Sequence, residues 1–165
     1  MKAGRKELQA FLNDLGIRVK TYDHETVFSV GEAEHLKETI SGAHSKNLFL
    51  KDKKSNYFLI TVEDNAIIDL KSIHHKIGAS GRVSFGSPEK LDEFLGLYPG
   101  AVSIFGAIND KNQQVKIIID EPLFNQPLIN GHPMSNDATM SIGNDDLARF
   151  IKATGHELHI IKVSE

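Results

Sequence analysis

The alternation of apolar and polar positions predicts short helices and strands in close succession. Leucine and phenylalanine recur at helical spacing over Lys2 to Leu15, which predicts an amphipathic helix. Ile17 to Tyr22 then alternates apolar and polar side chains, as a half-buried strand does. The segment from Ser29 to Ile40 opens with a serine followed three residues later by glutamate, the capping-box pattern that begins many helices.

The middle of the chain predicts a hairpin and two further helices. Strands over Lys46 to Leu50 and Tyr57 to Val62 flank a polar turn. A short helix is expected over Asp69 to Ile77, and Pro88 to Leu95 follows a serine cap, the favoured start of a helix. Two short strands are also expected in this region, over Arg82 to Phe85 and over Ala101 to Phe105.

Turn signals and apolar runs continue through the C-terminal third. Val115 to Ile119 is apolar on both faces apart from Lys116, which is typical of a central strand. The pair Asn130-Gly131 is a strong tight-turn signal. The other expected segments are a polar hairpin loop over Asn109 to Gln114, a strand over Asp137 to Ile142, a helix over Asp145 to Ala153 capped by Asn144, and a closing strand over His159 to Val163.

These elements lack the regular rhythm of strand, helix and strand that builds a parallel sheet. Helices mixed with frequent hairpins are typical of the α+β class. We therefore expect residues 1–165 to form a single domain, with a mixed, largely antiparallel sheet surrounded by helices.

Composition excludes several kinds of function. The chain has no cysteine, so disulfides, zinc–thiolate sites and thiol nucleophiles are ruled out. No apolar run approaches the ~20 residues of a membrane helix and no secretory signal begins the chain, so we expect a cytoplasmic protein without a membrane partner. The net charge of −3 argues against an indiscriminate nucleic-acid binder, and we expect no DNA partner, but local contact with a tRNA is compatible with it.

Positive charge is nevertheless uneven along the chain. Lys51, Lys53 and Lys54 form one cluster, and five basic residues lie between Lys71 and Arg82. A solvated surface explains such clusters as readily as a binding patch does.

Lys46 stands where a polar loop enters an apolar strand. Because alternate side chains of a strand share a face, Lys46 points the same way as Leu48 and Leu50. If these leucines face the core, the ammonium lies at the rim of a cleft. A lysine whose stem merely covers apolar surface gives the same pattern. The pattern by itself leaves both interpretations open.

Familiar catalytic and metal-binding signatures are absent from the sequence. There is no Gly-x-Ser-x-Gly elbow and no phosphate-binding P-loop. His156 and His159 are one residue short of the zincin spacing and would face opposite sides of a strand. His74 and His75 are adjacent, so they cannot chelate a metal from one helical face. We expect neither a metal nor another cofactor.

Three groups of residues remain that could converge on one site. Taken singly each has a structural explanation, since glycines mark turns and a histidine beside a turn is commonly structural. The glycines that flank the second group would let a ligand approach backbone amides closely. The groups are Lys46 and Asn47; Gly100, Ala101, Val102, Ser103, Ile104, Phe105 and Gly106; and Gly131, His132, Pro133, Asn136 and Thr139.

Together these groups resemble the YbaK-like, prolyl-tRNA-synthetase-associated editing domains, most closely the free-standing type that deacylates alanyl-tRNA(Pro). The blocks that carry the resemblance are Ser45 to Leu50, Pro99 to Gly106 and Gly131 to Thr139, and it covers nearly the whole chain. The resemblance implies a curved sheet and an ester hydrolase that acts on mischarged tRNA in trans. The implied partners are the 3′ acceptor end of that tRNA and prolyl-tRNA synthetase.

The resemblance also implies roles for single residues. Lys46 corresponds to the key catalytic-site lysine, and His132 helps to shape a pocket for a small aminoacyl group. The Gly-x-x-x-Pro element of the family corresponds to Gly100 to Ile104, and this chain has isoleucine where proline is usual.

An aminoacyl ester is already activated, so its hydrolysis needs a positioned water and charge stabilisation more than a strong nucleophile. Lys46 would hold the substrate 3′ end and the amides of Gly100 to Ser103 would bind the developing oxyanion. The sequence leaves open whether the substrate 2′-OH or a bound water handles the proton.

Two other functions and two assembly states are also open. The chain could edit another small aminoacyl-tRNA, such as cysteinyl-tRNA. It could also be a non-catalytic regulator that binds tRNA or a nucleotide on the same fold, which the isoleucine at position 104 favours. A monomer and a homodimer fit the sequence equally.

Overall fold

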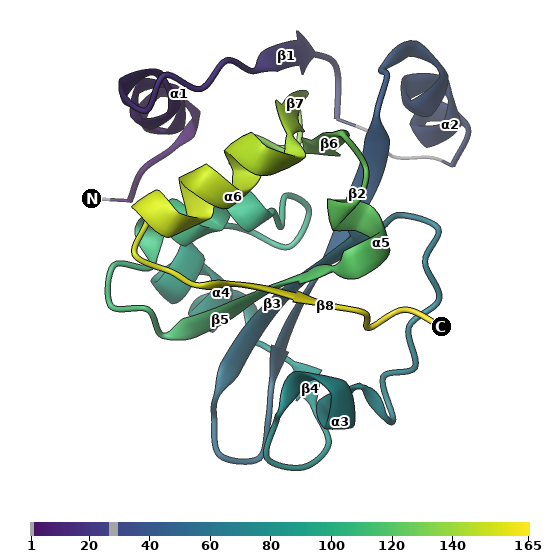
Figure 1. Ribbon diagram of the computed structural model, residues 1–165, viewed down its shortest axis with the longest axis vertical. Helices are drawn as coiled ribbons and strands as arrows, with labels where there is room; N and C mark the ends of the chain where they lie inside the picture. The colour runs from purple at the N-terminus through teal and green to yellow at the C-terminus, as the bar shows by residue number, and fades with distance from the viewer. Residues whose placement is uncertain (1, 27–29) are drawn as a thin grey trace.

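The computed structural model describes residues 2–26 and 30–165, which form an eight-stranded sheet with helices packed against it (Figure 1). The helices are α1 (Arg5–Asp14), α2 (Val30–Thr39), α3 (Ile73–Ile77), α4 (Pro88–Leu95), the 3-10 helix η1 (Ile104–Asn109), α5 (Glu121–Phe124) and α6 (Asn144–Ala153). The strands are β1 (Lys20–Asp23), β2 (Ala43–Lys51), β3 (Tyr57–Glu63), β4 (Ser84–Phe85), β5 (Val115–Asp120), β6 (Leu128–Gly131), β7 (Ala138–Gly143) and β8 (Leu158–Ile161).

The sheet mixes parallel and antiparallel pairs. Its strand order is β1-β7-β6-β2-β3-β5-β8, with β4 added beside β2. The pairs β1–β7, β6–β7, β2–β3 and β2–β4 are antiparallel, whereas β2–β6, β3–β5 and β5–β8 are parallel. The expected α+β class and mixed sheet are therefore confirmed.

Two hydrophobic clusters cover opposite faces of the central strands. The larger contains Phe49 and the buried side chains of α1, α4 and α6, and the smaller contains Leu50 and the two isoleucines of α3. Figure 1 accordingly draws α3 at the lower end of the molecule, away from α1 and α6. Because β2 is covered on both faces, Leu48 and Leu50 do face a core, but it is the smaller one.

Strand β2 changes its neighbour along one edge, and this change makes room for a site. Along its other edge it pairs with β3 over seven residues. On the first edge it pairs with β6 at Ala43 and His44, and with β4 at Leu50 and Lys51. Between these pairs no described strand lies beside residues 45–49. The loop that precedes η1 approaches this gap instead.

The strand expected over Ala101 to Phe105 is wrong. The segment turns and then enters η1, where the Ser103 hydroxyl accepts a hydrogen bond from the Phe105 amide at 3.2 Å. Residues 104–107 are all buried, which a strand with one solvent face would not allow. A short apolar run fits a buried helical turn as well as a strand, and here the capping serine decides between them.

Two expected turns are also wrong. Residues 109–114 do not close a hairpin, because they lead from η1 into β5, which runs parallel to β3. Asn130 and Gly131 end strand β6, and the turn lies later, over residues 132–137. The Asn130 amide donates to the Ser41 carbonyl at 3.0 Å, so its side chain links neighbouring segments and does not shape a turn.

Other differences concern the ends of elements. The first helix is shorter than predicted. So is the helix expected over 69–77, because Asp69 accepts hydrogen bonds from Ser72 and the Lys71 amide in a turn before α3. The strands expected over 17–22 and 159–163 are shifted by a few residues. Asn144 is the first residue of α6, and Gly143 holds the cap position. The Asn144 side-chain oxygen still accepts from the Asp145 amide at 2.8 Å, while its amide donates to the Phe124 carbonyl at 3.0 Å. The cap expected at Ser29 lies outside the described residues.

Candidate active site

A pocket of about 400 Å³ opens at the gap beside β2. It collects half of the fourteen residues expected from the sequence, namely Lys46, Asn47, Gly100, Val102, Gly131, His132 and Thr139. These come from β2, the loop before η1, the end of β6 and the start of β7, so the pocket joins all three groups. Its remaining wall includes residues of α2 and Asp64, whose carboxylate pairs with Lys37 at 2.7 Å.

Asn47 fixes the pocket loop to the sheet. Its amide donates to the Val102 carbonyl at 3.0 Å, and its side-chain oxygen accepts from the Thr61 hydroxyl at 2.6 Å. Thr61 is fully buried in β3, so the anchor is rigid. The single side chain of Asn47 thus bridges the gap that the missing strand neighbour leaves.

The Lys46 side chain lies at the rim of the pocket. Its ammonium donates to the Ala66 carbonyl at 2.8 Å, on the face of the sheet that also carries Leu48. An ammonium has three N–H donors, so this bond leaves two for a ligand. The expected position at a cleft rim is therefore present, with the stem over the smaller core and the head group fixed by a backbone carbonyl.

Two backbone amides of the pocket loop remain available to a ligand. The Ala101 amide donates to the Tyr98 carbonyl at 2.9 Å. The amides of Gly100 and Val102, which both line the pocket, make no hydrogen bond within the described part of the chain. They are backbone donors of the pocket lining that the described part of the protein leaves unused.

Ile104 explains why proline can be replaced in this loop. It is the first residue of η1, directly after the capping Ser103, and it is 3% exposed. The first helical position is one where proline is favoured because its amide is not needed. Isoleucine adopts the same helical start and fills the larger core, so the loop keeps its support from Asn47 and Ser103.

His132 presents a hydrogen-bond acceptor to the pocket. Its Nδ1 lies 3.0 Å from the Ala138 carbonyl. A carbonyl can only accept, so Nδ1 carries the proton, and in the neutral ring Nε2 is left with a lone pair. Nε2 makes no hydrogen bond to any residue that the structure describes. The ring is thus held by the backbone with its acceptor free for a ligand.

His24 belongs to the site and was missed from the sequence. Its Nδ1 lies 2.8 Å from the Glu25 carbonyl, and its Nε2 lies 2.9 Å from the Thr139 hydroxyl. By the same argument Nδ1 is the donor, so Nε2 of the neutral ring accepts the Thr139 proton. This orients the hydroxyl oxygen of Thr139, which lines the pocket, as an acceptor. The contact spans 115 residues, so no local pattern in the sequence points to it.

The remaining expected residues support the pocket without lining it. Asn136 accepts from the Tyr98 hydroxyl at 3.1 Å and thereby ties the loop after β6 to the loop before η1. In the same loop a hydrogen bond from the Ser135 hydroxyl holds the pKa of Asp137 below its usual value. The other supporting residues, all buried behind the pocket, are Ala101, Ser103, Ile104, Phe105, Gly106 and Pro133.

Gly106 has a packing role that differs from the expected one. A Cβ atom there would lie 2.7 Å from a methyl carbon of Leu97 and 3.1 Å from Leu95. Glycine is therefore required so that η1 can pack against the end of α4. Gly106 does not open the backbone to a ligand.

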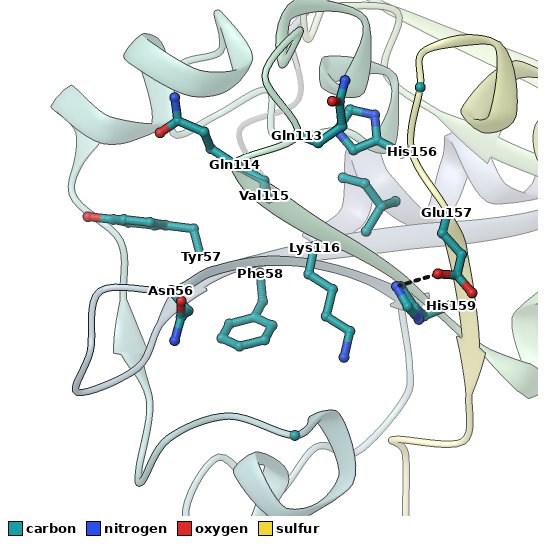
Figure 2. Close-up of a pocket in the computed structure, with 13 residues that line it drawn as sticks. Asn56, Tyr57, Phe58, Gln113, Gln114, Val115, Lys116, His156, Glu157 and His159 are labelled. Carbon is teal, nitrogen blue, oxygen red and sulfur yellow. Dashed lines mark ion pairs between the residues drawn. The ribbon is translucent and has the colours of Figure 1, made fainter.

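A second hollow of similar volume lies near the other end of the sheet, between β3, β5 and the segment before β8 (Figure 2). Its charged groups include Lys116, whose ammonium donates to the Ile77 carbonyl at 3.0 Å, and Glu157, which lies 3.8 Å from His159. None of the residues expected from the sequence lines it. The pocket beside β2 is therefore the stronger candidate.

His156, at the edge of that hollow, has a structural role. It is buried and lies 2.9 Å from the Asp110 carboxylate. Burial would raise the pKa of Asp110, but hydrogen bonds from His156 and from the amides of Gln114 and Val115 outweigh it and lower the pKa. The pair fixes the turn after α6 to the loop before β5.

Comparison with known proteins identifies the family of this chain. Residues 24–150 match the aminoacyl-tRNA editing domain family. The chain is 33% identical over 155 residues to the prolyl-tRNA editing protein ProX of Acetoanaerobium sticklandii, covering 93% of this chain and 94% of that protein. It is 36% identical over 157 residues to prolyl-tRNA synthetase associated domain-containing protein 1 of Mus musculus, covering 93% and 92%.

The fold is likewise shared with a solved structure. A crystal structure of a candidate trans-editing enzyme for prolyl-tRNA synthetase superposes with a TM-score of 0.71 over 98% of both chains, at 20% identity. None of the described helices is long and apolar enough to cross a membrane. The matched segment contains every residue that lines the pocket beside β2. The chain belongs to the aminoacyl-tRNA editing domain family, whose members are deacylases of aminoacyl-tRNA.

Proposed function

We propose that this protein hydrolyses the ester of mischarged Ala-tRNA(Pro) after prolyl-tRNA synthetase has released it. The observation that carries the proposal is the convergence of Lys46, the free amides of Gly100 and Val102, and two oriented acceptors in one pocket. The names of the relatives, which refer to prolyl-tRNA editing, support the choice of tRNA.

In this proposal Lys46 holds the 3′ end of the tRNA. Two of its N–H donors are free for the terminal phosphate or for the ester oxygens. A hydrogen bond between an ammonium and an anionic oxygen is about twice as strong as one between neutral groups. The Ala66 carbonyl keeps the ammonium at the pocket rim and thereby reduces the entropy that binding would cost.

The amides of Gly100 and Val102 stabilise the negative charge that develops on the carbonyl oxygen during hydrolysis. Such preorganised donors are worth on the order of 3 kcal/mol each in other ester and amide hydrolases. Asn47 matters here through its bond to the Val102 carbonyl, which keeps the loop in place. The attacking water, or the substrate 2′-OH, supplies the remaining proton chemistry.

The α-ammonium of the aminoacyl group needs acceptors, and the pocket offers two. These are Nε2 of His132 and the hydroxyl oxygen of Thr139, which His24 orients. An alanyl group presents a small side chain and a primary ammonium with three donors. A prolyl group carries a ring on this nitrogen, so the ring would crowd His132, although its two remaining donors would still match the two acceptors.

The test is a comparison of two substrates under single-turnover conditions. Purified protein is incubated with Ala-tRNA(Pro) and with Pro-tRNA(Pro), and the release of each amino acid is followed. We expect the alanyl ester to be hydrolysed at least ~100-fold faster, which corresponds to about 2.7 kcal/mol. Equal rates for both esters would overturn the proposal, as would slow hydrolysis of both.

Two alternatives make different predictions in the same experiment. An editor of another aminoacyl group would prefer, for example, Cys-tRNA over Ala-tRNA(Pro) in a panel of small aminoacyl esters. A non-catalytic regulator would bind aminoacyl-tRNA saturably without releasing the amino acid. The support that Ile104 and Asn47 give to the pocket loop favours the enzyme over the regulator.

A further inference from the structure

Phe85 is an exposed aromatic side chain whose surroundings point to nucleic acid. It is 59% exposed on the two-residue strand β4. An exposed apolar residue is ordinary in itself. Tyr98, the other exposed aromatic residue of the described ranges, is held through its hydroxyl by Asn136. Phe85 has no polar group to satisfy, so its ring offers only its surface.

The backbone that carries Phe85 is fixed on both sides. The Gly86 amide donates to the Phe49 carbonyl at 2.9 Å, and a Cβ atom on Gly86 would lie 2.4 Å from the Phe49 ring. On the other side the Ser80 amide donates to the Asp52 carboxylate at 2.8 Å. The ring therefore stands on a rigid segment that β2 holds, and a ligand would not have to order a loop.

Phe85 and Lys46 lie on the same face of the sheet. Phe85 is directly opposite Leu50 in the antiparallel ladder, and such partners point to the same face. Lys46 is four residues before Leu50 in β2, so it also shares that face. At ~3.3 Å per residue the two side chains are about 13 Å apart along the strand. Leu48 and Leu50 between them pack into the smaller core, so a ligand would follow the open edge of β2 that carries β4. Single-stranded RNA with stacked bases would cover this distance with roughly four nucleotides, at ~3.4 Å each.

Positive charge surrounds the same end of β2. The Lys53 side chain lies against Gly81, where a Cβ atom would be 2.7 Å from it. Burial lowers the pKa of His74, and the nearby His75, Arg82 and Lys53 lower it further, which places these side chains together. An RNA strand that leaves the pocket along the edge of β2 towards β4 would meet favourable charge for its phosphates.

We propose that Phe85 is a stacking platform for a base of the single-stranded 3′ end of the tRNA, upstream of the terminal nucleotide held at Lys46. The proposal rests on the proposed function, because that function places the terminal nucleotide at Lys46. It assigns a substrate contact outside the pocket. A base stacked on an aromatic ring contributes enough that its loss weakens binding roughly 5- to 150-fold.

The experiment measures binding of uncharged tRNA(Pro), so it does not depend on hydrolysis. Dissociation constants are determined for the wild type, Phe85→Ala, Phe85→Tyr and the control Ile67→Ala, which removes another exposed hydrophobic side chain. Each protein is tested with intact tRNA and with the same tRNA trimmed of its single-stranded 3′ nucleotides. Thermal unfolding verifies that the variants fold.

We expect Phe85→Ala to weaken binding of intact tRNA at least 5-fold. Phe85→Tyr and Ile67→Ala should bind intact tRNA as tightly as the wild type does. Trimmed tRNA should bind equally well to the wild type and to Phe85→Ala. Unchanged binding of intact tRNA by Phe85→Ala would overturn the proposal. An equal loss of affinity of Phe85→Ala for trimmed tRNA would also overturn it, because the ring would then contact the duplex. A change from dimer to monomer in sedimentation of Phe85→Ala would do the same, because the ring would then contact a second copy of the chain. If binding changes as expected while Ala-tRNA(Pro) is not hydrolysed, the platform stands and the proposed function fails.

Discussion

The two ends of β2 use polar side chains in opposite ways. At the hairpin end, Asp52 is buried and its carboxylate accepts four hydrogen bonds, from the amides of Lys54, Asn56 and Ser80 and from the Asn56 side chain. At the pocket end, Lys46 and His132 each make one bond to a backbone carbonyl. Their remaining donors and acceptor make no hydrogen bond to the residues that the structure describes.

This difference separates stability from function. A buried carboxylate with all its hydrogen bonds made is a structural support, because nothing in it is left to bind a ligand. A polar group that the protein holds by one bond and leaves otherwise free is preorganised for a ligand. Truncating a side chain at the pocket end should therefore lower activity and leave stability nearly unchanged. Truncating a side chain at the hairpin end should lower stability and leave the activity of the folded protein nearly unchanged.

Lys46→Ala carries the largest expected effect on the pocket side. The variant should lower kcat/KM for Ala-tRNA(Pro) at least ~100-fold, about 2.7 kcal/mol of transition-state stabilisation, because the substrate end loses its charged contact. The free energy of unfolding should change by less than about 1 kcal/mol, since the ammonium makes one hydrogen bond. Single-turnover hydrolysis and urea unfolding measure the two quantities.

Lys152→Ala, on the exposed face of α6, is the matched control and should leave both quantities unchanged. A Lys46→Ala protein that is destabilised by several kcal/mol and keeps its kcat/KM would reverse the comparison. Lys46 would then be a structural lysine.

Asp52→Asn is the corresponding change at the hairpin end. Hydrogen bonds from Ser80, Asn56 and Lys54 outweigh burial and lower the pKa of Asp52 from 3.8 to about 2. A carboxylate with a lowered pKa stabilises the fold above its unfolded pKa, and this stability is lost as the pH falls towards 2. At neutral pH the variant should therefore lose about 2 kcal/mol of unfolding free energy, while each folded molecule keeps its kcat/KM.

Urea unfolding between pH 7 and pH 2 shows in which direction the stabilisation by Asp52 changes with pH. The difference in stability between the wild type and Asp52→Asn should shrink as the pH falls from about 4 towards 2. The exposed carboxylate Asp92 on α4 provides a control in Asp92→Asn. A difference that stays constant over this range would show that the charge of Asp52 is not what stabilises the hairpin.

His132→Ala has the smallest expected effect and sharpens the account of selectivity. Removing the ring enlarges the pocket and removes one acceptor for the α-ammonium. The ratio of kcat/KM for Ala-tRNA(Pro) over Pro-tRNA(Pro) should fall about 10-fold, because small differences in an apolar pocket are worth only 1–3 kcal/mol. His159→Ala, in the second hollow, should leave the ratio unchanged. An effect of His159 as large as that of His132 would move the site to that hollow.

Local signals in the sequence were enough for the elements that depend on neighbours in the chain. Helix α4 begins where the serine cap and the proline predict, and its bounds match the expected range. The Ser87 hydroxyl accepts from the Lys90 amide at 3.1 Å. The β2–β3 hairpin follows for the same reason, since its polar turn separates two apolar runs. Its strands are each longer than predicted because partners in the sheet extend them.

Contacts between distant segments decided the rest. The short apolar run from Ala101 to Phe105 favours a strand, but no neighbouring strand is available there and Ser103 starts a helix. The pocket residues could be named from their blocks, whereas the bond from His24 to Thr139 spans 115 residues and has no local signature. Likewise, the alternation along β2 places Lys46 on the same face as Leu48 and Leu50, but it does not show that the Ala66 carbonyl holds the ammonium.

The most direct test of the central claim is to locate a substrate mimic on the molecule. Alanyl-adenosine in which a stable amide replaces the ester is titrated into isotope-labelled protein, and backbone amide shifts are followed by NMR. The account predicts saturable shifts at Gly100, Val102 and Gly131 and none at the Asp52 hairpin. Shifts that gather around Lys116 and His159, with the amides of the pocket loop unmoved, would contradict it.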